Sequence, residues 1–147
     1  MSVNRSDELA ESFVGLIHAF GVLRSDTTPC GQQMSVSTAH ALCELATGPP
    51  LNQRDLADRL GLSASTVSRL VDQLVAKGWA DRGPDPDGTD TRVRLVALTA
   101  DGNRVAGQVL AARAERFARL LDAVPTDRHT IVLESLHLLT AASDALD

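Results

Sequence analysis

The chain has 147 residues, of which 44% are hydrophobic and 22% are charged, and its formal net charge at pH 7 is −5. This length fits one domain with helical extensions, and the balance of apolar and charged residues excludes an intrinsically disordered chain. With three Phe, one Trp and no Tyr, stacking of single-stranded bases on aromatic side chains is excluded as well.

The acidic charge is spread along the chain. Residues 35–100 hold seven basic against eight acidic side chains, while residues 1–34 and 101–147 each carry a net charge of −2. The middle segment is the least acidic, but it is not a basic patch, so composition alone does not establish DNA binding.

The sequence predicts neither a secretory signal nor a membrane span. The first twenty residues lack a cationic segment followed by an apolar run, and no stretch has the roughly 18 to 20 apolar residues of a transmembrane helix. We therefore expect a cytoplasmic protein. Cys30 and Cys43 have no closely spaced partner, so we expect reduced thiols.

The first half of the chain predicts two helices. Apolar residues at three- and four-residue spacing indicate a helix that begins near Ser6 and ends near Leu23. Residues 24–34 are rich in turn-forming types and predict a loop. A second helix is expected over residues 37–46, and Gly48-Pro49-Pro50 ends it.

The second half predicts a hairpin and two more helices. Two short helical patterns fill residues 51–78, and residues 79–98 predict a β-hairpin with a polar tip at residues 83–88. Thr99 is placed to cap a long helix that reaches about Ala123. A final helix follows the break at Pro125.

Residues 53–72 satisfy the requirements of a helix-turn-helix. Ala57 supplies the small residue where the helices cross, and Gly61 supplies the turn. Ser63 is placed to cap the second helix, whose exposed N-terminus also suits a phosphate. The shared core is expected from the apolar side chains Leu56, Leu60, Leu62, Val67 and Leu70.

The second of these helices has one apolar and one polar face. At about 100° per residue, the face opposite Val67, Leu70, Val71 and Leu74 carries Ser65, Arg69 and Asp72, flanked by Thr66, Ser68 and Gln73. Arg pairs bidentately with guanine, Gln pairs with adenine, and Ser and Thr bond bases or phosphates. We interpret this face as reading a DNA groove, with Arg69 as the main base contact.

The stretch LNQRDLADRLGLSASTVSRLVDQLVAKGW, residues 51–79, resembles the multiple-antibiotic-resistance regulator (MarR) family. The motifs DPD at residues 85–87, DTR at residues 90–92 and LTADG at residues 98–102 strengthen the resemblance. It implies a dimeric transcription regulator, most often a repressor, that small anionic or lipophilic ligands commonly release from DNA. No cofactor is implied.

The resemblance also implies a role for the hairpin, which is the wing of this family. Arg92 matches the arginine that enters the minor groove, and Asp90 matches the acid that orients it. A narrow minor groove concentrates negative potential, which suits a constrained arginine. The family often has a second arginine where Thr91 stands, which suggests weaker wing contact. The alternative is an ordinary ion pair in a turn.

The predicted fold is mainly α-helical with a small β-hairpin wing. We expect residues 1–34 and 101–147 to form dimerisation helices around a winged helix-turn-helix lobe, residues 35–100, in one intertwined domain. A twofold dimer would place its recognition helices about 34 Å apart and would bind a pseudo-palindromic operator. Each apolar stripe could instead be covered within one subunit.

The resemblance also suggests candidate residues for an effector site. In the family, ligands lie where the dimerisation helices meet the DNA-binding lobe, which suggests His18, His40 and Arg113 as partners of an anion. Each could equally be an ordinary surface or core residue.

Other functions are set aside or kept as alternatives. We predict no metal site, because His40 and Cys43 lack further ligand-type neighbours, and no catalytic centre, because the usual nucleophile and phosphate motifs are missing. A thiol-based redox sensor acting through Cys30 and a winged helix that binds protein instead of DNA remain alternatives.

Overall fold

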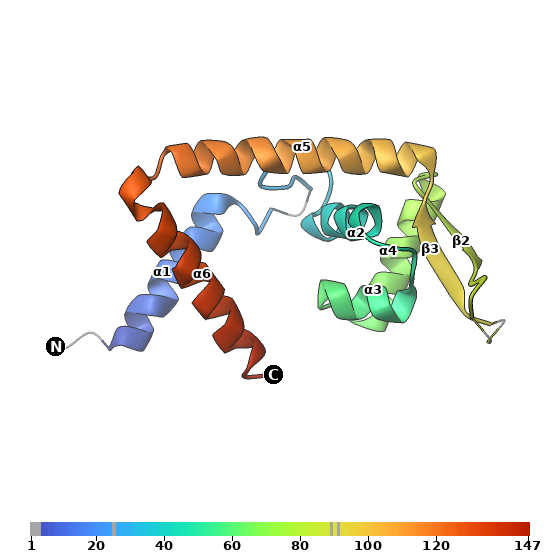
Figure 1. Ribbon diagram of the computed structural model, residues 1–147, viewed down its shortest axis with the longest axis horizontal. Helices are drawn as coiled ribbons and strands as arrows, with labels where there is room; N and C mark the ends of the chain where they lie inside the picture. Colours follow the sequence, from blue (N-terminus) through green and yellow to red (C-terminus); the bar gives the residue numbers. More distant parts are fainter. Residues whose placement is uncertain (1–3, 25, 89, 91) are drawn as a thin grey trace. The chain divides into compact units, whose positions relative to one another are not determined.

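The computed structural model describes residues 4–24, 26–88, 90 and 92–147. Contacts divide the chain into two compact units, Met1–Ala112 and Arg113–Asp147. In chain order the elements are α1 (Arg5–Phe20), α2 (Val36–Thr47), β1 (Leu51–Asn52), α3 (Gln53–Leu60), α4 (Ala64–Ala76), β2 (Ala80–Pro84), β3 (Arg94–Leu98), α5 (Ala100–Asp122), the 3-10 helix η1 (Thr126–Arg128) and α6 (His129–Asp144) (Figure 1). The predicted mainly helical fold with a β-hairpin wing is confirmed.

The hydrophobic core lies in the first unit, where α2, α3 and α4 pack on one another and on the sheet. The first half of α5 adds Val105, Ala106 and Val109 to this core. Its largest fully buried side chains come from three helices and one strand: Leu42, Leu56, Val67, Val71, Leu74 and Val96.

The helix-turn-helix forms as the sequence predicts. Gly61 adopts φ 64°, a left-handed conformation that costs a glycine little. The amide of Leu62 then donates to the carbonyl oxygen of Ala57 at 3.1 Å, and the side chain of Ala57 is buried at the crossing. The turn therefore brings α3 into contact with α4.

The sheet contains one strand that the sequence did not reveal. β2 and β3 form the predicted antiparallel hairpin, and β1 pairs with the other edge of β3, so that the order is β1-β3-β2. Leu51 lies opposite Val96 in this register. Two residues are too short to show an alternating pattern, which is why β1 could not be predicted.

The first two helices begin at Arg5 and Val36, each one residue before the predicted start, and the first helix ends at Phe20, before the predicted end near Leu23. The side chain of Asn4 accepts the amide of Ser6, so α1 begins before Ser6, and Gly21 ends it at φ 83°. Ser35 caps α2 by accepting the amide of Thr38 at 3.1 Å. Several polar residues near each helix start could serve as the N-cap, and the sequence does not show which of them has the backbone geometry of a cap.

The wing joins α5 through a close backbone contact. The hydroxyl of Thr99 accepts the amide of Gly102 at 3.0 Å and donates to the carbonyl oxygen of Gly78 at 2.6 Å. The amide of Thr99 donates to the carbonyl oxygen of Trp79 at 3.0 Å. Thr99 therefore caps α5, as predicted, and also ties its first turn to the segment before β2.

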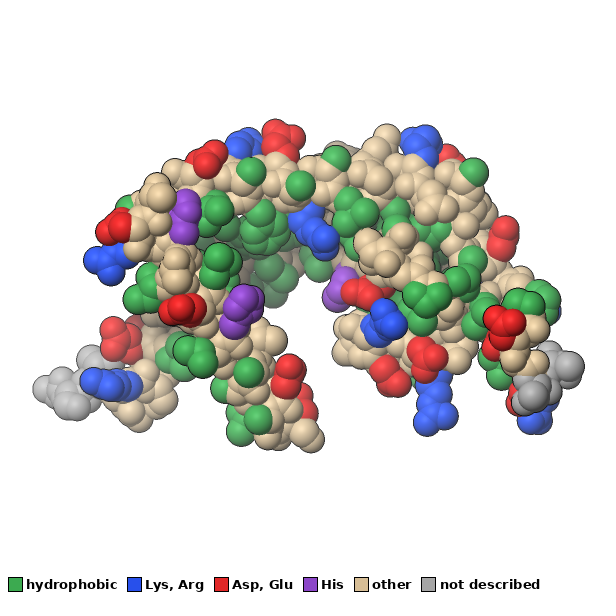
Figure 2. Space-filling model, viewed as in Figure 1, with side chains coloured by type: hydrophobic (Ala, Val, Ile, Leu, Met, Phe, Trp, Pro, Cys, Tyr) green, Lys and Arg blue, Asp and Glu red, His purple; other side chains and the backbone are tan. Residues whose placement is uncertain are grey.

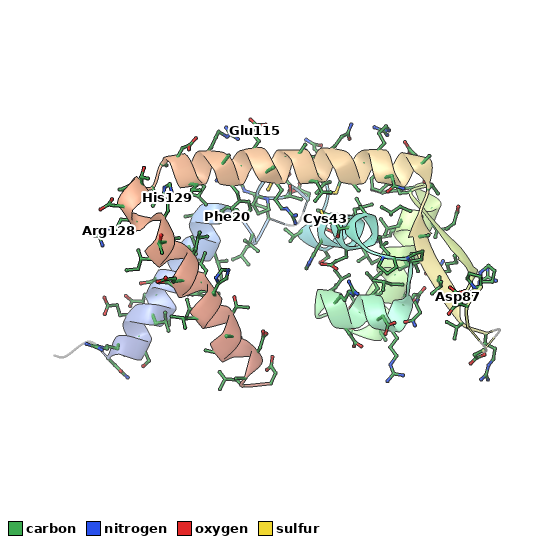
Figure 3. All side chains as sticks on the ribbon, in the orientation of Figure 1. Phe20, Cys43, Asp87, Glu115, Arg128 and His129 are labelled. Atoms are coloured by element: carbon green, nitrogen blue, oxygen red, sulfur yellow. The ribbon has the colours of Figure 1, made fainter. Side chains whose placement is uncertain are left out.

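The second unit comprises the end of α5, η1 and α6. At the turn into α6, the Nε2 atom of His129 lies 2.9 Å from the carbonyl oxygen of Val124 (Figure 3). No residue of α6 is buried, and hydrophobic side chains lie exposed along it (Figure 2). None of the helices in the described part of the chain has the length and hydropathy that a membrane span requires.

We predict that Gly102→Ala destabilises the protein. A Cβ atom at this position would lie 1.8 Å from the carbonyl oxygen of Trp79, so α5 must shift away from the wing, at a cost of about 1 to 3 kcal/mol. Gly107→Ala on the same helix is the matched control, because its Cβ would meet nothing within 4 Å. The control should stabilise the helix by roughly 0.5 to 1 kcal/mol. Urea unfolding followed by circular dichroism measures both, and equal shifts in the same direction would contradict the prediction.

Candidate nucleic-acid interface

The first turn of α4 carries a cluster of hydroxyl groups. Ser63 caps the helix, since its Oγ accepts the amide of Thr66 at 3.2 Å. The same oxygen lies 2.8 Å from the hydroxyl of Thr66 and 3.2 Å from that of Ser65. All three residues are exposed at the N-terminal end of the helix. Hydroxyls and a positive helix end together suit a phosphate or a base edge.

Burial of one face fixes where the rest of α4 points. Val67, Leu70, Val71 and Leu74 are buried, so Ser65, Arg69 and Gln73 are exposed on the other side, while Ser68 is half-buried. The structure thus places the polar residues predicted for DNA contact on one exposed surface, apart from Ser68, which lies at its edge.

A cavity of about 240 Å³ lies between α4 and the start of α2. It is lined by Thr66, Arg69, Leu70 and Gln73 of α4, by Ser37 of α2 and by Ser35, the N-cap of α2. The α2 serines were not predicted as site residues. The signal was the capping pattern at Ser35, which indicates a helix N-terminus but not its proximity to α4.

The wing presents a paired arginine. The guanidinium of Arg92 donates to both carboxylate oxygens of Asp90, at 3.1 and 3.2 Å, and its amide donates to Oδ1 at 3.0 Å. The side chain of Arg92 is nevertheless 89% exposed, so the predicted pair forms and leaves the arginine accessible. Thr91, the position where the family often has an arginine, lies outside the described residues.

A cationic cleft of about 490 Å³ lies between the wing and α3. Arg54, Arg82, Arg92 and Arg94 line it together with Asn52, Gln53, Val93 and Val96. Of these, only Arg92 was predicted as a site residue. The period-two spacing of Arg92, Arg94 and Val96 was the available signal, because alternate residues of a strand share a face.

Arg82 connects this cleft to α4. Its Nε donates to Oε1 of Gln53 on α3 at 3.0 Å, and its Nη2 donates to Oδ1 of Asp72 on α4 at 2.5 Å. Its own carbonyl oxygen accepts from Nη2 of Arg94 on β3 at 3.1 Å. The arginine cleft and the polar face of α4 are therefore neighbours.

The other face of the sheet is acidic. A second cleft, of about 540 Å³, is lined by Asp55, Asp81, Asp85 and Asp87, with Leu95 and Ala97 from β3. Asp87 lies at the wing in Figure 3. Because Asp81 and Arg82 are successive residues of β2, their side chains point to opposite faces. The wing thus separates positive from negative charge, although the lobe carries a net charge near zero.

The structure does not test the residues suggested for an effector site. His18 is exposed on α1, and Arg113 is exposed in the second unit. Nε2 of His40 lies 3.6 Å from the carboxylate of Glu44, which is also 3.7 Å from Arg59. These three positions remain predictions.

The cysteines and metal ligands give no further site. Cys43 is buried on α2 (Figure 3), and Cys30 is half-buried in the loop before it. Among the described residues, no group of three His, Cys, Asp or Glu side chains is arranged to hold a metal ion. The redox alternative at Cys30 stays untested.

The fold and this surface define a winged helix-turn-helix protein. Residues 32–89 match the sequence model of the MarR family. The multiple antibiotic resistance protein MarR of Salmonella typhimurium is 33% identical over 67 residues, which cover 46% of this chain and 45% of that protein. The match thus spans less than half the length of the curated relative. The predicted resemblance to the MarR family is confirmed over residues 32–89.

Two crystal structures have a similar fold over nearly the whole chain. The PcaV transcriptional regulator of Streptomyces coelicolor, in complex with its natural ligand, has a TM-score of 0.74 at 23% identity and covers 100% of this chain and 99% of its own. FabT of Streptococcus pneumoniae, in complex with DNA, also has a TM-score of 0.74, at 18% identity, covering 97% and 98%. At these identities the likeness concerns the fold.

We predict that the pKa of Asp90 lies below its ordinary value of 3.8, because the side chain and then the amide of Arg92 donate to its carboxylate. A lowered pKa means that the pair is intact above about pH 3.8 and is lost only as the pH falls through the lower, folded-state pKa. The pair should therefore be constant from pH 5 to 8. Carboxyl ¹³C titration by NMR measures the pKa, and Arg92→Gln should raise it. An unchanged pKa in that variant would contradict the assignment.

Proposed function

We propose that this chain is a transcription regulator that binds a specific sequence of duplex DNA as a homodimer. The observation that carries the proposal is the juxtaposition of two surfaces, the exposed polar face of α4 and the arginine cleft beside the wing, which Arg82 and Asp72 link. A helix suited to a major groove and an adjoining positive surface suited to phosphates are the two parts that sequence-specific DNA binding needs.

In this proposal α4 is the recognition helix. Arg69 and Gln73 are exposed on the same face, one helical turn apart, and reach base edges, where arginine selects guanine and glutamine selects adenine. Ser63, Ser65 and Thr66 hold a phosphate at the helix N-terminus, and Ser68 supports the edge of the same face.

The wing supplies the second contact. Arg92 enters a minor groove while Asp90 holds its guanidinium in one orientation, which lowers the entropy lost on binding. Arg54 and Arg94, which line the same cleft, are placed to neutralise the flanking phosphates. The FabT structure, which contains DNA, supports this use of the fold.

We predict that Arg69→Ala and Arg92→Ala weaken binding to an operator selected from random duplexes. Loss of the base contact at Arg69 should cost about 1 to 3 kcal/mol and relax specificity. Loss of the Arg92 charge, which in the minor groove lies between the two phosphate backbones, should lower the slope of log K against log[salt] by about 0.9 for each phosphate that is no longer neutralised. Fluorescence anisotropy over a salt titration measures both.

Arg104→Ala is the matched control for these variants, because it also removes one arginine from an ion pair, the exposed pair with Asp101 on α5. It should bind DNA like the wild type. Equal, weak affinity of the wild-type protein for selected and scrambled duplexes would contradict specific DNA binding. It would favour a protein-binding winged helix, for which the acidic cleft is the supporting feature.

The homodimer is proposed from the uncovered apolar side chains outside the winged lobe. In α1, Phe13 and Leu16 are 53% and 51% exposed, and in α6, Leu133 and Leu136 are 49% and 44% exposed. Exposed apolar residues at helical spacing indicate an interface. We propose residues 1–34 and 101–147 as the dimerisation segments around the lobe 35–100, and a pseudo-palindromic operator that follows from twofold symmetry.

We predict that Leu136→Asp dissociates the dimer, because it places a charge within the apolar stripe of α6. Leu138→Asp is the control, since Leu138 is 71% exposed and lies about 140° around the helix from Leu133 and about 160° from Leu136. Sedimentation velocity should show a monomer for the first variant and a dimer for the second. A wild-type protein that binds its operator as a monomer would contradict the proposal.

A second part of the proposal concerns regulation of DNA binding by a small-molecule ligand. We propose a repressor that a small anionic or lipophilic molecule releases from DNA, with His18, His40 and Arg113 as first candidates for substitution. The PcaV structure contains a natural ligand, which supports this use of the fold.

A further inference from the structure

We propose that Arg82 is a positioning residue that fixes the wing relative to α4, and that Asp72 is its anchor instead of a side chain that reads bases. This inference rests on the proposed DNA-binding function, because its purpose is to hold two DNA contacts at a set separation. It assigns a role to Gln53 as well, as the second holder of the same guanidinium.

The contacts of Arg82 join three elements besides its own strand. From β2, its side chain donates to Gln53 on α3 at 3.0 Å and to Asp72 on α4 at 2.5 Å, while its carbonyl oxygen accepts from Arg94 on β3 at 3.1 Å. The wing strands pair with each other along their length, so a constraint on Arg82 reaches both of them. A planar guanidinium held at two nitrogens permits little rotation.

Exposure separates Arg82 from the other arginines of the cationic cleft. The side chain of Arg82 is 30% exposed, against 89% for Arg92. The partners differ as well, because Arg82 donates to residues of two other elements, Gln53 on α3 and Asp72 on α4, whereas Arg92 donates to Asp90, two residues away in the same turn. Arg82 therefore ties the wing to two helices, whereas Arg92 moves with the wing and stays exposed enough to reach DNA.

The position of Asp72 is otherwise difficult to explain. A carboxylate that is 65% exposed on a recognition helix repels DNA phosphates unless its charge is compensated. The guanidinium of Arg82 supplies that compensation, and the pair is aligned well enough for a charge-assisted hydrogen bond. Asp72 therefore favours binding indirectly, by fixing the wing, although its charge alone opposes binding.

The test uses the full-length chain with Arg82→Met, Asp72→Asn and both together. Methionine keeps the aliphatic stem and removes every donor, and asparagine keeps the shape and removes the charge. Arg92→Met represents an arginine that contacts DNA, and Arg104→Met removes a paired arginine on α5. Operator affinity is measured across a salt titration, and amide hydrogen exchange of β2 and β3 is measured without DNA.

We expect Arg82→Met to weaken operator binding about five- to tenfold, since a well-formed ion pair contributes roughly 1 kcal/mol. Its salt slope should stay near the wild-type value, whereas Arg92→Met should lose about 0.9 of slope for a phosphate contact. Asp72→Asn should also weaken binding, and the double variant should be no weaker than Arg82→Met alone. Strand amides should exchange faster in all three Asp72 and Arg82 variants, but not in Arg104→Met.

Two results would overturn the inference. Tighter DNA binding by Asp72→Asn would mean that its carboxylate only repels, and a full unit of salt slope lost in Arg82→Met would mean that Arg82 contacts phosphate. If the wild-type protein binds no operator, the proposed function fails, but hydrogen exchange still decides whether Arg82 holds the wing. Unchanged exchange in Arg82→Met and Asp72→Asn would reject that role.

Discussion

The packing of α4 against α2 and α3 fixes the direction in which its polar face points, and the candidate DNA surface depends on that direction. A helix has no freedom to rotate once Val67, Val71 and Leu74 are fully buried, because each residue advances about 100° around its axis. Arg69 and Gln73 therefore point toward solvent because the buried side chains on the opposite face fix the rotation of the helix. Substitutions in the core would thus alter affinity by turning the helix, as well as by lowering stability.

Strand alternation explains how an acidic chain can carry a cationic surface. Charges of opposite sign at neighbouring positions, such as Asp81 and Arg82, cancel in the composition but point to different faces of the sheet. The cleft on one side of the sheet is lined by four arginines, and the cleft on the other side is lined by four aspartates. The potential that a phosphate meets depends on this local arrangement and is screened beyond about 10 Å at 0.1 M salt, so net charge is a poor guide to nucleic-acid binding here.

Local signals made most of the fold predictable. Gly61, Ser63 and the spacing of apolar residues act within one or two helical turns, and the structure has the turn, cap and buried face that they predict. Asp90 and Arg92, two residues apart, were predictable for the same reason. Contacts over longer separations were not: Arg82 and Gln53 are 29 residues apart, and nothing in either local pattern points to the other. Strand β1 was not predicted either, because its two residues are recognisable as a strand only from their pairing with β3.

The distribution of burial indicates that folding of the winged lobe does not depend on the proposed dimer. The core cluster runs from Ala39 to Val109 and includes no residue of α1 or α6, so the winged lobe has its own source of stability among the described residues. The apolar side chains of α1 and α6 are still exposed in a single chain, and covering them would add free energy that depends on protein concentration. Loss of the proposed dimer should therefore leave α4 and the wing folded, while removing the symmetry that would set two recognition helices on one operator. Affinity would then fall because one half-site binds alone, with the contacts of each half-site preserved.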